Sequence, residues 1–214
     1  MLLCLVSVKR SYSSTKRQAQ ARDTRRSILD AALELFMASG YSATSIQRIA
    51  ERAGVAVQTV YAVFGTKRDL LRELIETRIA GGDESLPTVE RPEAQSVAAE
   101  PDLRRRVELG AALTRSIVER VAPVVRVAEE AAASDPDLAA MMEAMKAARQ
   151  HEMIASAAIL PGPDGLRVDP EEAAATLYVL CSPQVANMLM GDYDWSPQRY
   201  EDWLARMILQ SVTQ

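Results

Sequence analysis

The chain has 214 residues, enough for a small domain joined to a larger one, and its 48% apolar content suffices for a buried core. Ten prolines and nine glycines are too few for a sandwich or barrel with many tight turns, so we expect an all-α protein. Cys4 and Cys181 exclude a disulfide framework and favour the reducing cytoplasm. The apolar residues 1–8 are too short to cross a membrane and lack the marks of a signal peptide, so we expect no membrane partner.

The net charge of −4 hides an uneven distribution along the chain. Residues 1–80 hold 13 Lys+Arg against 7 Asp+Glu, whereas residues 81–214 hold 12 against 22. The basic first third favours a polyanionic partner, and DNA would repel the acidic remainder. Taken alone, this distribution also fits ordinary surface charge.

A basic segment precedes the first apolar pattern. Between residues 9 and 26, seven Lys and Arg residues lie among serines, threonines and glutamines. This composition cannot bury apolar surface, so we expect residues 1–22 to form a disordered basic arm. The arm is either a solvated tail or a segment that follows phosphates or enters a minor groove, as homeodomain arms do.

Residues 23–66 have the pattern of a three-helix head. A first helix over residues 23–39 is expected to end at Gly40. Two short apolar stripes then repeat at helical spacing on either side of Gly54; they are Ile46, Ile49, Ala50 and Ala53, and then Val57, Val60, Tyr61 and Phe64. The second stripe leaves small or uncharged residues on its opposite face, which suits a helix that enters a DNA major groove. The pattern predicts a helix-turn-helix whose second helix is the reader.

Capping signals mark the helix starts in this region. Thr44 with Gln47, and Thr66 with Asp69, each have the spacing of a capping box. A connecting helix is expected over residues 67–82. Three prolines then interrupt residues 83–101, which we interpret as a loose linker that includes a short helix over residues 93–99.

Residues 102–214 predict a larger helical body. Five helices are expected, over residues 102–121, 124–133, 138–160, 171–190 and 196–212. Pro123 is expected to separate the first two, and Asp135 with Pro136 to open the third.

The head resembles the tetracycline-repressor (TetR) family of bacterial transcription regulators. The likeness covers about residues 23–80 and rests on fragments in a fixed order and spacing; they are Ser39-Gly40-Tyr41, Thr44-Ser45-Ile46, Ile49-Ala50, Ala53-Gly54-Val55, Thr59-Val60-Tyr61, Phe64-Gly65 and Lys67. A fainter likeness covers the C-terminal helices, from Leu180-Cys-Ser-Pro183 to Trp203-Leu204. Each fragment alone is unspecific, but the set is specific.

The resemblance implies a homodimer that binds a palindromic double-stranded DNA operator and is released by a small effector. It places Thr44, Tyr61 and Lys67 at phosphates, with Gln58, Thr59 and Arg48 as the candidates for reading bases. The last two long helices would pair with a second subunit. The dimer residues that this implies are Leu177, Cys181, Gln184, Met188, Leu204 and Ile208.

Three positions depart from the family pattern. Ala56 stands where a capping Ser is usual, and Ala62 and Val63 replace a polar residue and a second tyrosine. The reading helix therefore lacks a side-chain cap worth about 1 kcal/mol, and its groove surface has fewer polar groups. Contact with thymine methyl groups, or greater use of the basic arm, would compensate.

The body has several candidates for an effector site. Met141 and Met145 belong to a methionine-rich helix, and Arg115, Arg149 and Tyr178 are polar candidates near it. The same methionines suit ordinary core packing. His151 has no Cys or second His nearby, so we expect no metal or other cofactor.

A helical enzyme and a protein-binding adaptor are the alternatives to a DNA-binding regulator. The sequence has no phosphate-binding glycine loop, paired metal ligands or nucleophile elbow, so we expect no enzyme. Steeply salt-dependent binding to a palindromic duplex would separate the regulator from both alternatives.

Overall fold

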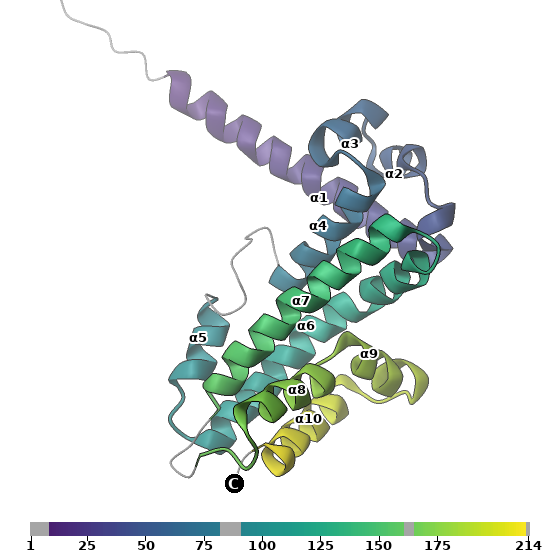
Figure 1. Cartoon of the computed structure of the whole chain (residues 1–214). Coiled ribbons are helices and arrows are strands. Elements are labelled where there is room, and N and C mark those ends of the chain that lie inside the picture. Colours follow the sequence, from purple (N-terminus) through teal and green to yellow (C-terminus); the bar gives the residue numbers. More distant parts are fainter. Residues whose placement is uncertain (1–8, 82–90, 161–164, 213–214) are drawn as a thin grey trace, which may run out of the picture. The chain divides into compact units, whose positions relative to one another are not determined.

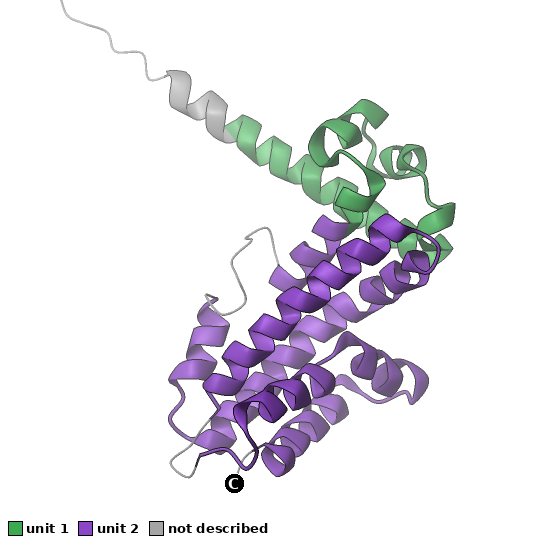
Figure 2. Cartoon of the chain, viewed as in Figure 1, with its two compact units in different colours: residues 1–71 green, residues 72–214 purple. Residues whose placement is uncertain are grey.

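The computed structural model describes residues 9–81, 91–160 and 165–212, with side chains from Lys16 onward. All regular elements of this described part are helical (Figure 1). They form two compact units, residues 1–71 and residues 72–214 (Figure 2), so the predicted division into a head and a body is present. The division falls within the predicted connecting helix instead of at either of its ends.

The smaller unit contains α1 (Lys9–Ala43), α2 (Ile46–Ala53), α3 (Val57–Phe64) and the first turn of α4 (Lys67–Ala80). Its core residues come from every one of these helices; they are Ile28, Leu29, Ala32, Phe36, Ile49, Ala50, Val60, Phe64, Leu70 and Leu71. The three-helix head predicted from the apolar stripes is therefore confirmed in its elements.

Helix α1 begins at Lys9, so the prediction of disorder is wrong for residues 9–22; residues 1–8 lie outside the described residues. No proline or glycine occurs between Lys9 and Ser39, and alanine, arginine, glutamine and lysine are good helix formers. The packed half of α1 supplies the nucleus, and adding turns to an existing helix is cheaper than starting one. At Gly40 the helix breaks as predicted, with φ of 75°.

The larger unit contains the rest of α4, then α5 (Pro92–Ala99), α6 (Leu103–Ala132), α7 (Pro136–Ala158), α8 (Pro170–Leu180), α9 (Pro183–Ala186), the π-helix η2 (Asn187–Asp192) and α10 (Pro197–Ser211). Its core lies between α6, α7, α8 and α10; the most buried members include Val107, Ala111, Val118, Ala173, Tyr200 and Leu204. The predicted short helix at residues 93–99 and the starts of α7 and α10 are confirmed.

Two predicted boundaries of this unit are wrong. Pro123 does not end a helix, because α6 continues through it with Val121 and Val124 buried on either side. Burial of such side chains offsets the roughly 3 kcal/mol that proline costs inside a helix. Conversely, the predicted helix over residues 171–190 breaks at Cys181, where Ser182 caps a new helix that has Pro183 in its first turn.

Among the described residues, no single helix has the length and apolar composition to cross a membrane. The bent pair formed by Pro170–Leu180 and Pro183–Asp192 passes the same test of length and composition together.

Candidate DNA-binding site

The helix-turn-helix is formed by α2, Gly54 and α3. Gly54 has φ of 69°, the left-handed conformation that glycine adopts at low cost, and the Val55 amide donates to the Ala50 carbonyl at 3.0 Å. Val60 and Phe64 bury one side of α3, which leaves Gln58 and Ala62 exposed. This arrangement presents a short helix surface of small and uncharged side chains, as a major-groove reader requires.

The candidate readers on α3 are accessible to different degrees. Gln58 is exposed, Thr59 is half-buried, and Tyr61 is 54% exposed, so its hydroxyl is available to a ligand. Val57, from the same apolar stripe, is half-buried. Ala56 precedes α3 without a side-chain cap, as predicted from its missing hydroxyl.

Thr44 does not act as predicted. Its side chain is 1% exposed and its hydroxyl donates to the carbonyls of Gly40 at 2.8 Å and Leu35 at 3.2 Å. Ser45 is the true cap of α2, because its Oγ accepts a hydrogen bond from the Arg48 amide at 3.2 Å. The prediction failed because either residue suits the cap, and only burial of Thr44 decides between them. The phosphate contact predicted for Thr44 was through the N-terminus of its helix, and it stays a prediction.

Lys67 is also engaged within the head. Its Nζ donates to the carbonyls of Tyr41 and Thr44, both at 2.9 Å, and lies 4.1 Å from the centre of the Tyr41 ring. The ammonium group therefore holds the turn between α1 and α2. The predicted capping box at the start of α4 is confirmed, since Thr66 and Asp69 bond each other's amides at 3.2 and 3.1 Å.

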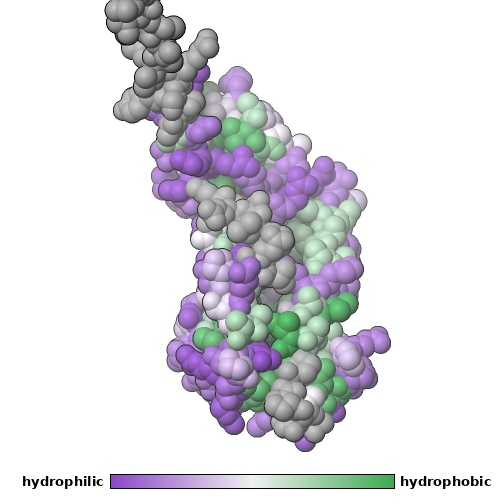
Figure 3. Space-filling view, turned by 90° about the vertical axis from the view of Figure 1, so that its left-hand side faces the viewer, coloured by the Kyte–Doolittle hydropathy of each residue, from purple (hydrophilic) through white to green (hydrophobic). Residues whose placement is uncertain are grey.

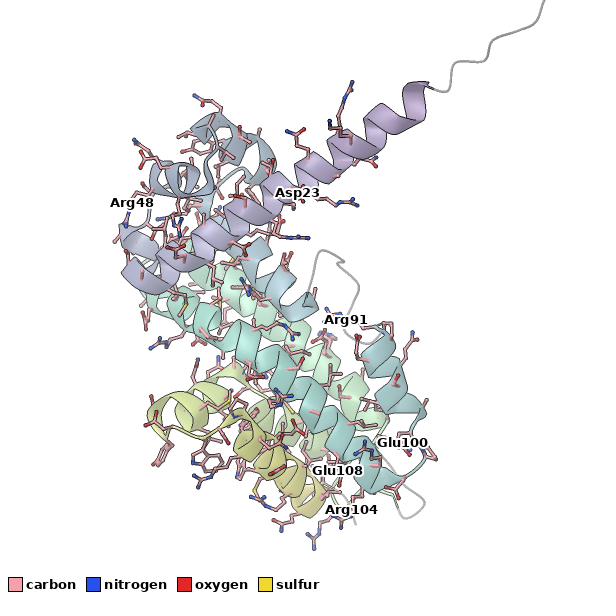
Figure 4. The ribbon with its side chains drawn as sticks, turned by 180° about the vertical axis from the view of Figure 1, so that it is seen from behind. Asp23, Arg48, Arg91, Glu100, Arg104 and Glu108 are labelled. Atoms are coloured by element: carbon pink, nitrogen blue, oxygen red, sulfur yellow. The ribbon has the colours of Figure 1, made fainter. Side chains whose placement is uncertain are left out.

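Arg48 and Arg25 complete the charged surroundings of the reader. Arg48 is exposed at the start of α2 (Figure 4), but its guanidinium donates to the Ala43 carbonyl at 3.0 Å and contacts Ser39 Oγ at 3.4 Å. Arg25 of α1 lies 5.0 Å from the centre of the Phe64 ring, at the C-terminal end of α3. The sequence did not reveal Arg25, because no local pattern links it to a ring 39 positions away.

The predicted effector residues separate into two groups in the larger unit. Arg149 donates to the Tyr178 carbonyl at 2.9 Å and stacks 3.7 Å from the centre of its ring, so these two predicted residues are together. Arg115 instead bonds Glu201 and Glu119, which raises the pKa of its guanidinium and gives it a structural role between α6 and α10. Met141 and Met145 are half-buried on α7.

Neutral polar groups surround Arg149. Burial raises the pKa of the Cys181 thiol to about 11, against smaller opposing effects of a Thr114 hydrogen bond and the Arg149 charge. Burial also raises the pKa of the Tyr200 phenol, whose hydroxyl donates to the Leu180 carbonyl at 3.3 Å. Both groups are uncharged at neutral pH. In the described ranges no group of three or more His, Cys, Asp or Glu side chains is arranged to hold a metal ion.

Three of the six residues predicted for the dimer interface, Leu177, Leu204 and Ile208, are buried within the single chain. The Cys181 thiol points inward as well. Gln184 and Met188 are exposed, and Val179 and Tyr193, which were not predicted, are exposed nearby in the chain.

Helices α2 and α3 have the arrangement of a helix-turn-helix. Residues 28–74 match the family model described as bacterial regulatory proteins, tetR family. The HTH-type transcriptional regulator SrpR of Pseudomonas putida is 41% identical over 63 residues, which are 29% of this chain and 30% of SrpR. The N-terminal unit thus contains a segment similar to bacterial regulatory proteins of the tetR family.

Solved structures resemble the chain over most of its length. The crystal structure of NalD, the secondary repressor of the MexAB-OprM multidrug efflux pump in Pseudomonas aeruginosa, has a TM-score of 0.67 at 22% identity and covers 89% of this chain and 97% of NalD. The SmeT–triclosan complex has a TM-score of 0.66 at 21% identity and covers 89% of this chain and 92% of SmeT. These likenesses show the fold. The matched segment spans less than half the length of the curated relatives.

Proposed function

We propose that the chain is a cytoplasmic, homodimeric repressor whose head binds a palindromic operator and whose body binds a small effector. The observation that carries the proposal is the surface of α3, where Gln58 and Tyr61 are exposed above a buried side formed by Val60 and Phe64. Gln58 presents a donor and an acceptor that match adenine, and Thr59 offers a methyl group to thymine. Tyr61 binds a phosphate.

Three of the predicted DNA-contact residues have bonds within the head. Thr44, Arg48 and Lys67 hold the turn before α2 and thereby orient the reading helix. We propose this positioning role for them in place of direct contacts, with the amides at the N-terminus of α2 binding the DNA backbone.

The proposed effector site lies at Arg149 and Tyr178. An arginine stacked on a phenol, with half-buried Met145 on the same helix as Arg149, offers one charge beside flexible apolar side chains. The solved complex of SmeT with triclosan supports a small apolar molecule as one kind of ligand for this fold.

The proposed dimer uses exposed apolar residues of the body. Val179 is 57% and Met188 49% exposed. The face of the larger unit drawn in Figure 3 also has apolar surface among hydrophilic surface. Exposed apolar groups of this size are typical of interaction sites.

Coupling between effector and operator would pass through α4. Two arginines of the larger unit bond the last carbonyls of this helix; Arg120 Nε donates to Arg78 at 3.0 Å, and Arg91 (labelled in Figure 4) donates to Ile79 at 2.6 Å. Burial and the neighbouring Arg91 charge lower the pKa of Arg120. An effector that moves α6 would thus shift the end of the helix that leads to the head, with a coupling of about 1–3 kcal/mol.

Selection of bound fragments from genomic DNA, followed by titration over a range of salt concentrations, tests the proposal. We expect the binding constant for a selected fragment to fall steeply with salt, because each neutralised phosphate releases about 0.9 counterion. Binding that is absent, or that does not vary with salt, would contradict a DNA-directed function.

A further inference from the structure

The N-terminal extension is residues 9–22 of α1, and none of its described side chains belongs to the buried core of the head. It lies before residue 28, where the match to the family model begins. Its described side chains are almost all exposed, and Figures 1 and 4 show it extending beyond α2 and α3 as an uninterrupted helix. The exposed charged side chains of Lys16, Arg17 and Arg22 suggest a surface that meets something outside the chain.

The extension starts beside the C-terminal ends of both helices of the helix-turn-helix. Arg25 stacks on Phe64, the last residue of α3, and Ser27 Oγ donates to the carbonyl of Ala53, the last residue of α2, at 3.0 Å. Because α1 continues without a break, these contacts fix the direction of the extension relative to the reading helix.

Helix register directs basic residues of the extension toward the helix-turn-helix. Arg17 precedes the buried Ile28 by eleven residues, or about three turns, so it lies on the side of α1 that faces α2 and α3. Lys16 precedes Ser27 by the same interval and is also in register with Glu34; Ser27 and Glu34 bond Ala53 and Arg52 of α2.

The distance of Arg17 from the end of α3 suits contact with a phosphate at the edge of the major groove. Arg17 precedes Arg25 by eight residues, which is about 12 Å along the helix. The major groove is about 12 Å wide, so a basic side chain displaced by this distance from the end of a groove-bound helix reaches the flanking backbone. Arginine binds phosphate through paired donors.

We propose that the N-terminal extension is a second DNA-contact element, in which Arg17 binds a backbone phosphate beside the major groove that α3 enters. The inference rests on the proposed DNA binding by the head. It extends that proposal to a segment outside the family match, and the contact adds affinity without sequence preference.

Arg17→Ala and Arg104→Ala form a matched pair that tests the extension. Each removes one positive charge from an exposed helical position, Arg17 in the extension and Arg104 on α6 of the larger unit, and alanine preserves the helix, which far-UV circular dichroism checks. Titration of the full chain with a mixed-sequence duplex at several salt concentrations should give a log K–log salt slope about one unit smaller for Arg17→Ala than for Arg104→Ala. The ratio of affinities for selected and mixed DNA should be unchanged in both.

Equal slopes for the two variants would overturn the proposal. A change in the sedimentation of Arg17→Ala without DNA, combined with an unaltered slope, would assign the extension to a protein contact and overturn it too. If the unmodified chain shows no salt-dependent binding, the proposed function itself fails, so the two failures are distinguishable.

Discussion

At the scale of single residues, the turn between α1 and α2 is held by one ammonium group. Lys67 Nζ bonds two carbonyls of the turn and lies against Tyr41, whose ring is 5.5 Å from that of Phe36. The Thr44 hydroxyl satisfies two further carbonyls. Buried carbonyls that lose such donors cost about 1–3 kcal/mol each, so these polar side chains stabilise the platform from which α2 and α3 project.

Lys67→Met, which keeps the length of the side chain and removes the charge, should lower the free energy of unfolding by about 1–3 kcal/mol. Denaturant unfolding followed by circular dichroism measures this loss, with amide hydrogen exchange near residues 41–46 as a local readout. Lys16→Met, on an exposed part of α1, is the control and should change stability by less than about 0.5 kcal/mol. Unchanged stability together with weaker DNA binding would restore the phosphate contact predicted from the sequence.

At the scale of elements, α6 and the π-helix η2 are joined at a point where both are irregular. Asn187, the first residue of η2, donates from Nδ2 to the carbonyl of Ala122 at 3.0 Å, directly before Pro123. Pro123 lacks the amide hydrogen that would bond the Glu119 carbonyl one turn earlier, and Asn187 joins η2 to α6 beside this position through a separate carbonyl.

Asn187→Ala should reduce the free energy of unfolding by about 1–2 kcal/mol, since a half-buried carbonyl loses its side-chain donor. Gln184→Ala is the matched control. The Gln184 amide also reaches α6, at Glu129, but on the exposed surface, so its loss should cost less than about 0.5 kcal/mol. Urea titration measures the free energy of unfolding of both variants. Equal losses of stability would mean that the bond to Ala122 has no special role.

Local signals in the sequence predicted most of the elements, because the head is built from short-range features. Each of these features depends only on residues a few positions away. Examples are the glycines at 40 and 54, the Thr66–Asp69 cap and the apolar stripe of α2. The continuation of α6 through Pro123 and the inward position of Leu204 depend on packing between distant segments, which periodicity does not contain. The candidate site shows the same contrast. The apolar stripe of α3 predicted that Gln58 is exposed, but no local pattern predicted that Lys67 bonds the carbonyls of Tyr41 and Thr44.

At the scale of the whole molecule, the proposed function divides between the two ends of the chain. The basic third holds the helix-turn-helix, and the acidic remainder holds the proposed effector and dimer surfaces, so in the proposed complex charge would attract the head to DNA and repel the body. In a dimer, two copies of α3 would match half-sites about one helical turn apart. The N-terminal extension would add affinity, while α3 selects the sequence.

The most direct test of this account compares the affinity of Gln58→Ala for a selected genomic fragment and for a mixed-sequence duplex. Gln47→Ala, the same change on α2, serves as the control. We expect Gln58→Ala to lower the affinity for the selected fragment relative to mixed DNA by about 5- to 100-fold, equivalent to about 1–3 kcal/mol. The affinity for mixed DNA should change little. Equal loss on both duplexes, or a ratio that Gln47→Ala lowers just as far, would contradict the assignment of α3 as the reader.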